Sequence, residues 1–309
     1  MAEPIHLKGK QPEVDPSKIG ISYSGGGALV LVELGIARAF VTLGIVPAVI
    51  TGVSAGALAG AAHALDPVGG RGIRLAADIL GQVSNRLLGL TPLRVLWRLA
   101  MQRQHITSLG DNATIRPLIT AGLKREFGLP EVTIGDFKPP DRPVLMVLAT
   151  DIENREAVWF PDPTPLVDAL IASSSIPGVF PWRTLVIDGK RRLLADGGVV
   201  MNQPLSNLVE HGCGTLYVCA VGPTQPFGPP RNALENAIRT INLSMHQATK
   251  LEEEYVKLKL NEKGIVHHIH PYSSLSGANF DFTPQMIRDV MADAEAQTIK
   301  WLSGEESRA

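Results

Sequence analysis

The amino-acid sequence predicts an α/β fold in which helices cover both faces of a mainly parallel sheet. Short apolar runs rich in β-branched residues alternate with longer segments of helical periodicity, which is the pattern of successive βαβ units. The chain has 309 residues, and 45% of them are hydrophobic. A chain of this length and composition can bury a large core, so its stability requires neither disulfide bonds nor a structural metal.

The N-terminal part of the chain predicts a compact β-loop-α-β-turn-α unit. A strand at residues 19–23 is followed by three glycines and by a helix at about 28–43. A second strand at 46–51 leads into a sharp turn at 52–56 and then into a helix that ends near Leu65. Consecutive strands of a parallel sheet end at the same edge, so we expect the glycines and the turn to lie side by side.

The rest of the chain continues this alternation. Residues 71–127 are expected to be helical, with breaks at 89–92 and 110–112, and to cover the site as a cap region. The elements expected after it are strands at 144–150 and 156–160, a helix at 165–172, a hairpin of 183–187 and 192–195 around Asp188-Gly189, a strand at 216–221, a helical stretch at 231–262, a strand at 266–270 and a helix at 284–302.

We expect a single domain over residues 18–302, between a flexible N-terminal segment at 1–17 and a flexible tail at 303–309. No internal repeat is visible, and no feature of the sequence specifies an oligomeric state. An uncharged stretch at 39–62 is long enough to span a bilayer, but several glycines and Pro47 interrupt it. A β-branched run followed by a small-residue turn and an Ala-rich helix is typical of a buried strand and its helix, which favours the soluble interpretation.

Charge and cysteine content exclude several classes of protein. The 29 Lys and Arg residues balance the 30 Asp and Glu residues, so no basic face is expected and nucleic acid is not an expected partner. Cys213 and Cys219 lack the spacing of a zinc or redox motif, which predicts buried free thiols in a reducing compartment and no metal. The polar N-terminus lacks the apolar segment of a secretory signal, so we expect a cytoplasmic protein.

The turn at residues 52–56, Gly52-Val53-Ser54-Ala55-Gly56, has the pattern of a nucleophile elbow. A serine on a tight strand-to-helix turn exposes its hydroxyl above the sheet, and the flanking Gly52 and Gly56 remove Cβ atoms that would clash with the neighbouring strand and helix. The following helix directs free N–H groups toward that hydroxyl. The alternative is a helix-capping serine without catalytic function.

Gly25, Gly26 and Gly27 are the second candidate motif. Consecutive glycines can direct their backbone N–H groups toward one point, as an oxyanion hole requires. A dinucleotide-binding turn is disfavoured because Val30 occupies the position of the third required glycine and Thr51 replaces the expected acidic residue. A loop without chemical function is the remaining alternative.

A serine nucleophile needs a partner that accepts its proton, and an aspartate is the clearest candidate. None of the eight histidines lies in a motif-like setting. Asp196 ends an apolar strand and is followed by Gly197 and Gly198, which allow the backbone to turn and a substrate to approach. Asp196 could instead be an ordinary turn residue, and the rival Asp151 is expected to be one.

Four motifs in this order resemble the patatin-like phospholipase family. They are Gly25-Gly26-Gly27, Gly52-Val53-Ser54-Ala55-Gly56-Ala57-Leu58, the segment Ala172–Pro181, and Asp196-Gly197-Gly198-Val199-Val200-Met201-Asn202-Gln203-Pro204. The resemblance covers about residues 18–225. It implies a three-layer α/β/α sandwich similar to acyl-carrier-protein acyltransferases, and a Ser-Asp dyad that acts without histidine, metal or cofactor.

Carried over by motif, the resemblance makes Ser54 the nucleophile, Asp196 its base and Gly25, Gly26 and Gly27 the oxyanion loop. It implies a serine esterase or lipid acyl hydrolase of the phospholipase A or lysophospholipase type, whose partner is a lipid or another acyl ester. The family usually continues its glycines with a basic residue and a glycine, whereas this chain has Leu29 and Val30. That departure keeps a catalytically weak lipid-binding module open as an alternative.

Two enzymatic alternatives also remain open. One is an acyltransferase that uses the same dyad with an alcohol or thiol in place of water. The other is an α/β-hydrolase triad with His246 or His270, which fits poorly because only two predicted strands precede Ser54.

Residues 79–110 contain Arg86, Arg94, Arg98 and Arg103 and no acidic residue. Apolar positions at roughly helical spacing accompany these arginines, which suits transient contact with an anionic membrane surface. A cap helix packed on the domain with a solvated basic edge is the alternative interpretation.

Overall fold

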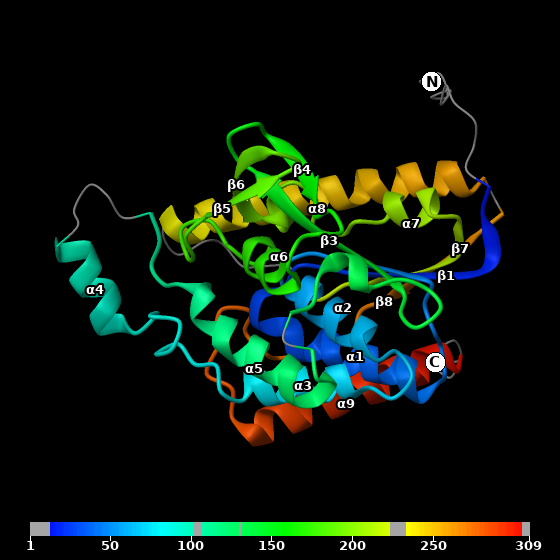
Figure 1. The fold of residues 1–309 in the computed structure, drawn as a ribbon, viewed down its shortest axis with the longest axis horizontal. Coiled ribbons are helices and arrows are strands. Elements are labelled where there is room, and N and C mark those ends of the chain that lie inside the picture. Colours follow the sequence, from blue (N-terminus) through cyan, green and yellow to red (C-terminus); the bar gives the residue numbers. More distant parts are fainter. Residues whose placement is uncertain (1–12, 102–106, 130, 223–232, 262, 305–309) are drawn as a thin grey trace.

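A mostly parallel sheet forms the centre of the protein, as seen in the computed structural model, which describes residues 13–101, 107–129, 131–222, 233–261 and 263–304 (Figure 1). Its strands follow the order β5-β6-β3-β2-β1-β7-β8, and β4 pairs with the C-terminal half of β3, beyond the part that pairs with β2. The strands are β1 (Asp15–Tyr23), β2 (Val49–Gly52), β3 (Val144–Asp151), β4 (Glu156–Trp159), β5 (Arg183–Ile187), β6 (Lys190–Asp196), β7 (Cys213–Cys219) and β8 (Ile265–Ile269).

The central strands β3, β2, β1, β7 and β8 are parallel, whereas β4, β5 and β6 pair in antiparallel fashion beside β3. The expected mainly parallel sheet is therefore confirmed, with an antiparallel extension. Tyr23 at the end of β1 pairs with Gly52 at the end of β2 and with Cys219 at the end of β7. The segments that leave these three strands consequently start at one edge of the sheet.

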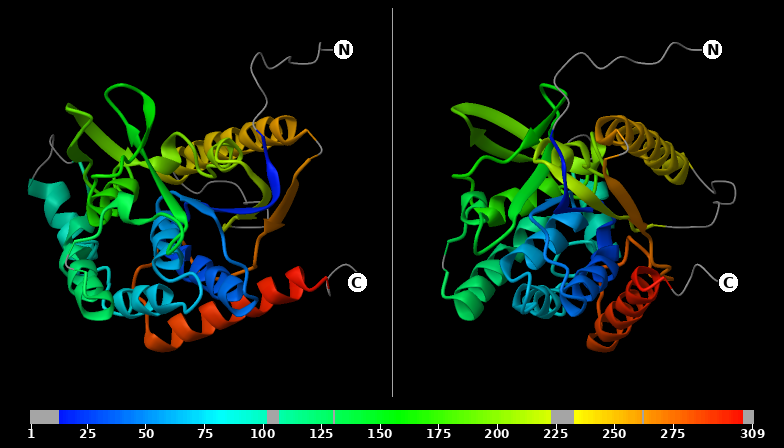
Figure 2. Two further views of the ribbon diagram at one scale, coloured as in Figure 1. Left: turned by 45° about the vertical axis from the view of Figure 1, so that its right-hand side comes forward. Right: turned by 90° about the vertical axis from the view of Figure 1, so that its right-hand side faces the viewer.

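Helices cover both faces of the sheet (Figures 1 and 2). One face carries α1 (Val30–Thr42), α2 (Ala55–Leu65), α3 (Arg71–Leu80), α5 (Arg116–Phe127), α6 (Leu166–Ser173) and α9 (Pro284–Leu302). The largest apolar core lies between these helices and the sheet. Its fully buried members include Ile21, Tyr23, Leu31, Leu34, Phe40, Ile50 and Leu145.

The opposite face carries α7 (Ser206–Glu210) and the long α8 (Ala233–Leu260). A second apolar cluster joins these helices to the sheet, and it contains Val49, Leu205, Leu208, Val209, Leu216, Val256 and Leu260. The two clusters make the sheet the middle layer, as a three-layer α/β/α sandwich requires.

The helix α4 (Pro92–Met101) lies at the periphery of the molecule (Figures 1 and 2). It belongs to the region 71–127 that was expected to be a helical cap. In Figure 1 the strand β1 runs from right to left, so the carboxyl ends of the parallel strands face the side on which α4 lies.

Several element boundaries differ from the sequence-based expectation. The first strand begins at Asp15, so residues 15–17, expected in a flexible segment, belong to the sheet; their exposed side chains give no apolar signal. The second strand begins only at Val49, after Pro47, which has no N–H for a sheet ladder. The five-residue helix α7 was not predicted because it is too short to show a helical period.

The uncharged stretch at residues 39–62 is divided between α1, β2 and α2, in agreement with the strand-and-helix interpretation. No helix in the described ranges has the length and apolarity needed to cross a bilayer. The expected flexible ends at 1–12 and 305–309, and residues 231–232 and 262 of the expected long helix, lie outside the described residues.

Candidate active site

Ser54 lies on a sharp turn between β2 and α2. Its backbone has φ 54° and ψ −121°, a conformation that non-glycine residues rarely adopt and that costs about 1–3 kcal/mol. The close approach of α2 to β1 explains the glycine that follows: a Cβ atom on Gly56 would lie 2.3 Å from the carbonyl oxygen of Tyr23. The strained backbone is thus held in place by tight packing on both sides of the serine, as in a nucleophile elbow.

The glycine loop lies directly beside this turn. A Cβ atom placed on Gly25 would lie 3.4 Å from Cβ of Ser54 and 2.5 Å from Oδ1 of Asn202. A Cβ atom placed on Gly198 would lie 2.9 Å from the same Asn202 oxygen and 3.0 Å from Oδ1 of Asp196. The three sequence motifs therefore converge around Asn202.

Asp196 ends β6 and is almost completely buried. Its Oδ1 accepts the N–H of Gly198 at 2.8 Å, and its backbone carbonyl accepts the Thr150 hydroxyl at 2.8 Å. Its Oδ2 is buried and has no hydrogen-bond partner among the described residues. One carboxylate oxygen thus fixes the orientation of the side chain, and the other remains free to accept a proton.

The environment of Asp196 shifts its protonation equilibrium. Burial raises the pKa of this carboxyl to about 6, and the nearby Ser54 hydroxyl and Gly198 N–H oppose the rise. No hydrogen bond of normal geometry joins the Ser54 hydroxyl to Asp196. The distance between a nucleophile and its base is often long in a free enzyme and shortens when the substrate binds.

A run of three serines at the end of α6 connects the two candidate catalytic segments. The Ser173 hydroxyl accepts the backbone N–H of Ser54 at 3.0 Å and donates to the carbonyl of Leu148 at 2.6 Å. Two residues later, the carbonyl of Ser175 accepts the backbone N–H of Asp196 at 2.9 Å. The end of α6 therefore fixes the spacing of Ser54 and Asp196, a role that the sequence pattern did not indicate.

Ser173→Ala is expected to lower the free energy of unfolding by about 1–3 kcal/mol, because it leaves the N–H of Ser54 buried without a partner. The rate at which a fluorophosphonate labels Ser54 should fall as well. Ser174→Ala is the control, because the Ser174 hydroxyl donates to the carbonyl of Leu170 and does not reach the turn. Equal labelling rates and stabilities of the two variants would contradict the positioning role of Ser173.

The glycine loop offers fewer free donors than its sequence suggests. The N–H of Gly25 donates to the carbonyl of Asn202 at 3.2 Å. By contrast, the N–H groups of Gly26, Gly27 and Ala55 have no acceptor in the described part of the chain. The neighbouring Gln203 fixes the Asp196–Pro204 segment to the sheet, because its amide donates to the carbonyl of Ser22 at 2.9 Å.

Two buried residues, Leu29 and Glu33, lie next to the glycine loop, and only Leu29 was singled out from the sequence. Leu29 is buried against Val221 and Leu275, so apolar packing fills the place where the resemblance implied a basic side chain. Glu33 in the first turn of α1 is fully buried, and its Oε1 accepts the Ser24 hydroxyl at 3.5 Å. Burial raises the pKa of Glu33 well above its ordinary value, which favours its neutral form beside the loop.

No histidine of the described ranges forms a hydrogen bond with Ser54 or Asp196. The exposed His270 contacts the carbonyl of Gly222, and His246 lies on the exposed side of α8. His63 is bound to the Tyr23 hydroxyl at 2.9 Å, and burial lowers its pKa to about 3. This arrangement gives no support to a Ser-His-Asp triad; His6 and His105 lie outside the described residues.

Asp151, the rival carboxylate, ends β3 and caps the turn that follows it, in agreement with the expected turn or capping role. It accepts backbone N–H groups from Glu153 and Asn154 and forms an ion pair with Arg192 at 3.0 Å. No group of three or more His, Cys, Asp or Glu side chains in the described ranges could hold a metal ion.

The candidate site is nearly closed. Only 4% of Ser54 and 6% of Asp196 is exposed. A cavity of about 320 Å³ near Trp182 and Arg183 is not lined by either residue, and we do not assign it to the catalytic centre. A long acyl substrate would therefore require movement of the covering segments.

Comparison with known proteins identifies the family and supports the fold. A family model described as patatin-like phospholipase matches residues 21–209, which is more than half of the chain. Among solved structures, VipD from Legionella pneumophila superimposes with a TM-score of 0.50 at 15% identity, covering 98% of this chain and 72% of its own. No curated protein matches the chain by sequence.

Two other structures align at lower scores. Human GIVD cytosolic phospholipase A2, in complex with a methyl gamma-linolenyl fluorophosphonate inhibitor and terbium chloride, gives a TM-score of 0.49 at 13% identity; the alignment covers 96% of this chain and 59% of that one. ExoU from Pseudomonas aeruginosa, in complex with SpcU, gives 0.44 at 13% identity over 94% of this chain and 53% of that one. The chain thus spans little more than half the length of these two structures.

Proposed function

The chain belongs to the patatin-like phospholipase family, and from this membership we propose that it is a serine lipid acyl hydrolase of the phospholipase A or lysophospholipase type. Family membership supports lipid hydrolysis in general. The convergence of Ser54, the free Oδ2 of Asp196 and the glycine loop at one sheet edge is the observation that supports the specific mechanism.

The proposed reaction passes through an acyl-serine. The Ser54 oxygen attacks the ester carbonyl carbon while Oδ2 of Asp196 accepts the hydroxyl proton, and the leaving alcohol takes that proton as its bond to carbon breaks. Water then attacks the acyl-serine with the same carboxylate as base, which releases the fatty acid and restores Ser54. A carboxyl with a pKa of about 6 is a stronger base than an ordinary aspartate and is still ionised at neutral pH.

We assign oxyanion stabilisation to the free N–H groups of Gly26 and Gly27, with Ala55 at the start of α2 as a third donor. Each well-placed donor lowers the barrier by about 3–4 kcal/mol. Gly25, included in the loop predicted from sequence, is proposed to act by close approach, because its N–H is already bound to Asn202.

The buried Leu29 favours esters of low charge as a second candidate substrate class. A basic side chain after the glycines could contact an anionic head group, and an apolar one cannot. The backbone donors of the loop do not depend on that side chain. Two alternatives to hydrolysis remain: transfer of the acyl group to an alcohol or thiol, and lipid binding without catalysis.

The two buried free cysteines support a reducing, cytoplasmic location.

The test is fatty acid release from phosphatidylcholine, lysophosphatidylcholine and a chain-length series of neutral esters. We expect release by the wild type and none above background by Ser54→Ala. Preference for neutral esters over both phospholipids would identify the second substrate class, and a new ester formed in the presence of an added alcohol would identify acyl transfer. Absence of turnover on every ester by a folded wild-type protein would contradict the proposed hydrolase.

A further inference from the structure

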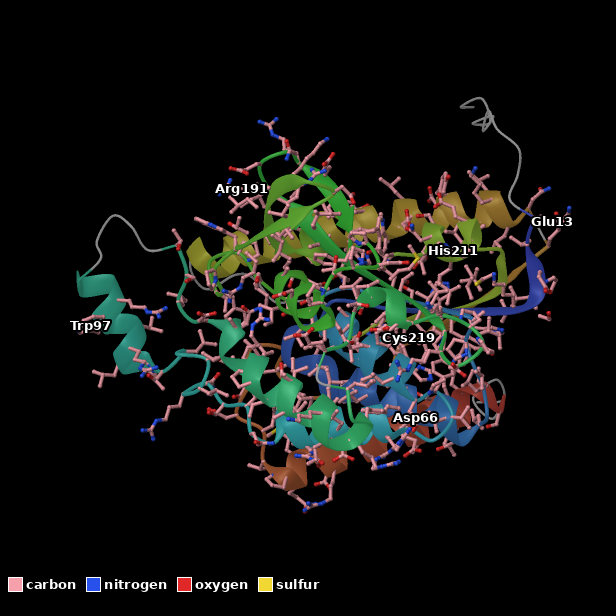
Figure 3. The ribbon with its side chains drawn as sticks, viewed as in Figure 1. Glu13, Asp66, Trp97, Arg191, His211 and Cys219 are labelled. Atoms are coloured by element: carbon pink, nitrogen blue, oxygen red, sulfur yellow. The ribbon has the colours of Figure 1, made fainter. Side chains whose placement is uncertain are left out.

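The helix α4 presents apolar side chains to solvent. Leu93 is 79% exposed and Trp97 is 60% exposed. Residues four positions apart lie on the same face of a helix, so the two form one apolar strip. In Figure 3 the Trp97 side chain lies on α4 at the edge of the molecule. An exposed strip of this kind, on a helix that leaves the body of the protein, indicates a contact surface.

Within residues 79–110, which include α4, every Lys, Arg, Asp or Glu residue is an arginine. Arg86 and Arg94 are exposed, and no acidic residue occurs in residues 79–110. Arg98 faces the body of the protein, where its Nη1 donates to the carbonyl of Leu109 at 2.7 Å. Arg103 lies outside the described residues. An apolar strip beside exposed arginines that form no ion pair within the described part of the chain complements a bilayer with anionic head groups.

The position of α4 relative to the candidate site fits the same partner. Arg98 connects α4 to Leu109, whose backbone N–H donates to the carbonyl of Gly178 at 3.1 Å. Gly178 follows the serines that hold Ser54 and Asp196, and α4 lies on the side toward which β1 and β2 end (Figure 1). Contact through α4 would therefore direct the candidate site toward the contacted surface.

We propose that α4 is an interfacial anchor that docks on an anionic lipid bilayer, with Leu93 and Trp97 inserted and Arg86 and Arg94 at the phosphates. The inference rests on the proposed function, because a lipid hydrolase gains access to its substrate by binding the surface that contains it. Tryptophan suits this position because its ring is apolar and its N–H is polar, as the border of a bilayer requires. The anchoring is reversible, since one short helix inserts little apolar area.

Flotation of the 309-residue chain with vesicles tests the proposal. Vesicles of phosphatidylcholine with added phosphatidylglycerol should bind the wild type, and pure phosphatidylcholine vesicles should bind it less. The double variant Leu93→Ser/Trp97→Ser should lower the partition coefficient by roughly tenfold or more. Arg86→Gln/Arg94→Gln should lower it by about tenfold on the anionic vesicles only, and added salt should mimic this change.

Val68→Ser is the matched control. Val68 is 69% exposed and follows α2, at the far end of that helix from Ser54, so its loss should leave vesicle binding unchanged. The proposal is overturned if the α4 double variant floats like the wild type, or if the wild type ignores anionic vesicles and binds only through a protein partner.

Failure of the anchor and failure of the enzyme can be told apart. Ser54→Ala should float normally, and Leu93→Ser/Trp97→Ser should hydrolyse a water-soluble short-chain ester at the wild-type rate. A protein that floats but turns over no ester retains the anchor and loses the proposed hydrolase. A protein that hydrolyses the soluble ester and does not float retains the hydrolase and loses the anchor.

Discussion

Ser54→Ala is expected to abolish both ester hydrolysis and covalent labelling by a fluorophosphonate. Removal of a serine nucleophile lowers kcat/KM by at least about 10⁴-fold, because no other group forms the acyl intermediate. The fold should persist: the turn is held by the packing of Gly56 on β1 and by the bond from the Ser54 N–H to Ser173, and alanine retains both.

Peptide mapping of the labelled wild type should locate the adduct on Ser54. Ser174→Ala is a suitable control, because Ser174 is adjacent to Ser173 in the chain but its hydroxyl donates to the carbonyl of Leu170; this variant should label normally. Labelling of Ser54→Ala at the wild-type rate, or an adduct on another serine, would refute the assignment of the nucleophile.

Asp196→Asn is expected to remove activity and to stabilise the fold at neutral pH. The raised pKa of about 6 means that the folded state holds the Asp196 proton more tightly than the unfolded chain, whose aspartate has a pKa near 3.8. As the pH rises from about 4 through 6, stability is therefore lost, and above pH 6 the penalty for the buried charge is complete. Asparagine removes that penalty, which amounts to about 3 kcal/mol.

Urea unfolding at neutral pH measures this change, and Asp151→Asn provides a control of opposite sign. Burial tends to raise the pKa of Asp151, but bonds from Asn154 and Arg192 outweigh it and the pKa is lowered. Loss of that charge should therefore destabilise the protein. An Asp196→Asn variant that is less stable than the wild type, or that turns over substrate at the wild-type rate, would contradict this account. Asp196 would then not be a buried base whose charge destabilises the folded protein.

The residues of the candidate site that were predictable from sequence are those at the ends of consecutive strands. Gly25–Gly27 and Ser54 follow β1 and β2, and parallel pairing places such segments together without further information. Asp196 was predictable as a polar residue at the end of an apolar strand. Its proximity to Ser54, however, depends on β6 lying beside β3, which local sequence does not specify.

The supporting contacts were not predictable, because each joins distant parts of the chain. The bond between the Ser54 N–H and Ser173 spans 119 residues, and the serine run gives no local signal for it. Likewise, the sequence suggested that all three glycine N–H groups are free for an oxyanion hole, but the N–H of Gly25 is already bound to the carbonyl of Asn202. The antiparallel pairing of β5 with β6 follows from the hairpin at Asp188-Gly189, which has positive φ at both residues and was recognised from sequence.

If Asp196 accepts the proton of Ser54, the rate of fluorophosphonate labelling must depend on the protonation of that carboxyl. The labelling rate of the wild type should rise with pH through a midpoint of about 6 and level off above it, as the carboxyl loses its proton. Asp196→Asn should label slowly and without this step. A step that survives in Asp196→Asn, or that disappears instead in His246→Ala or His270→Ala, would contradict the dyad.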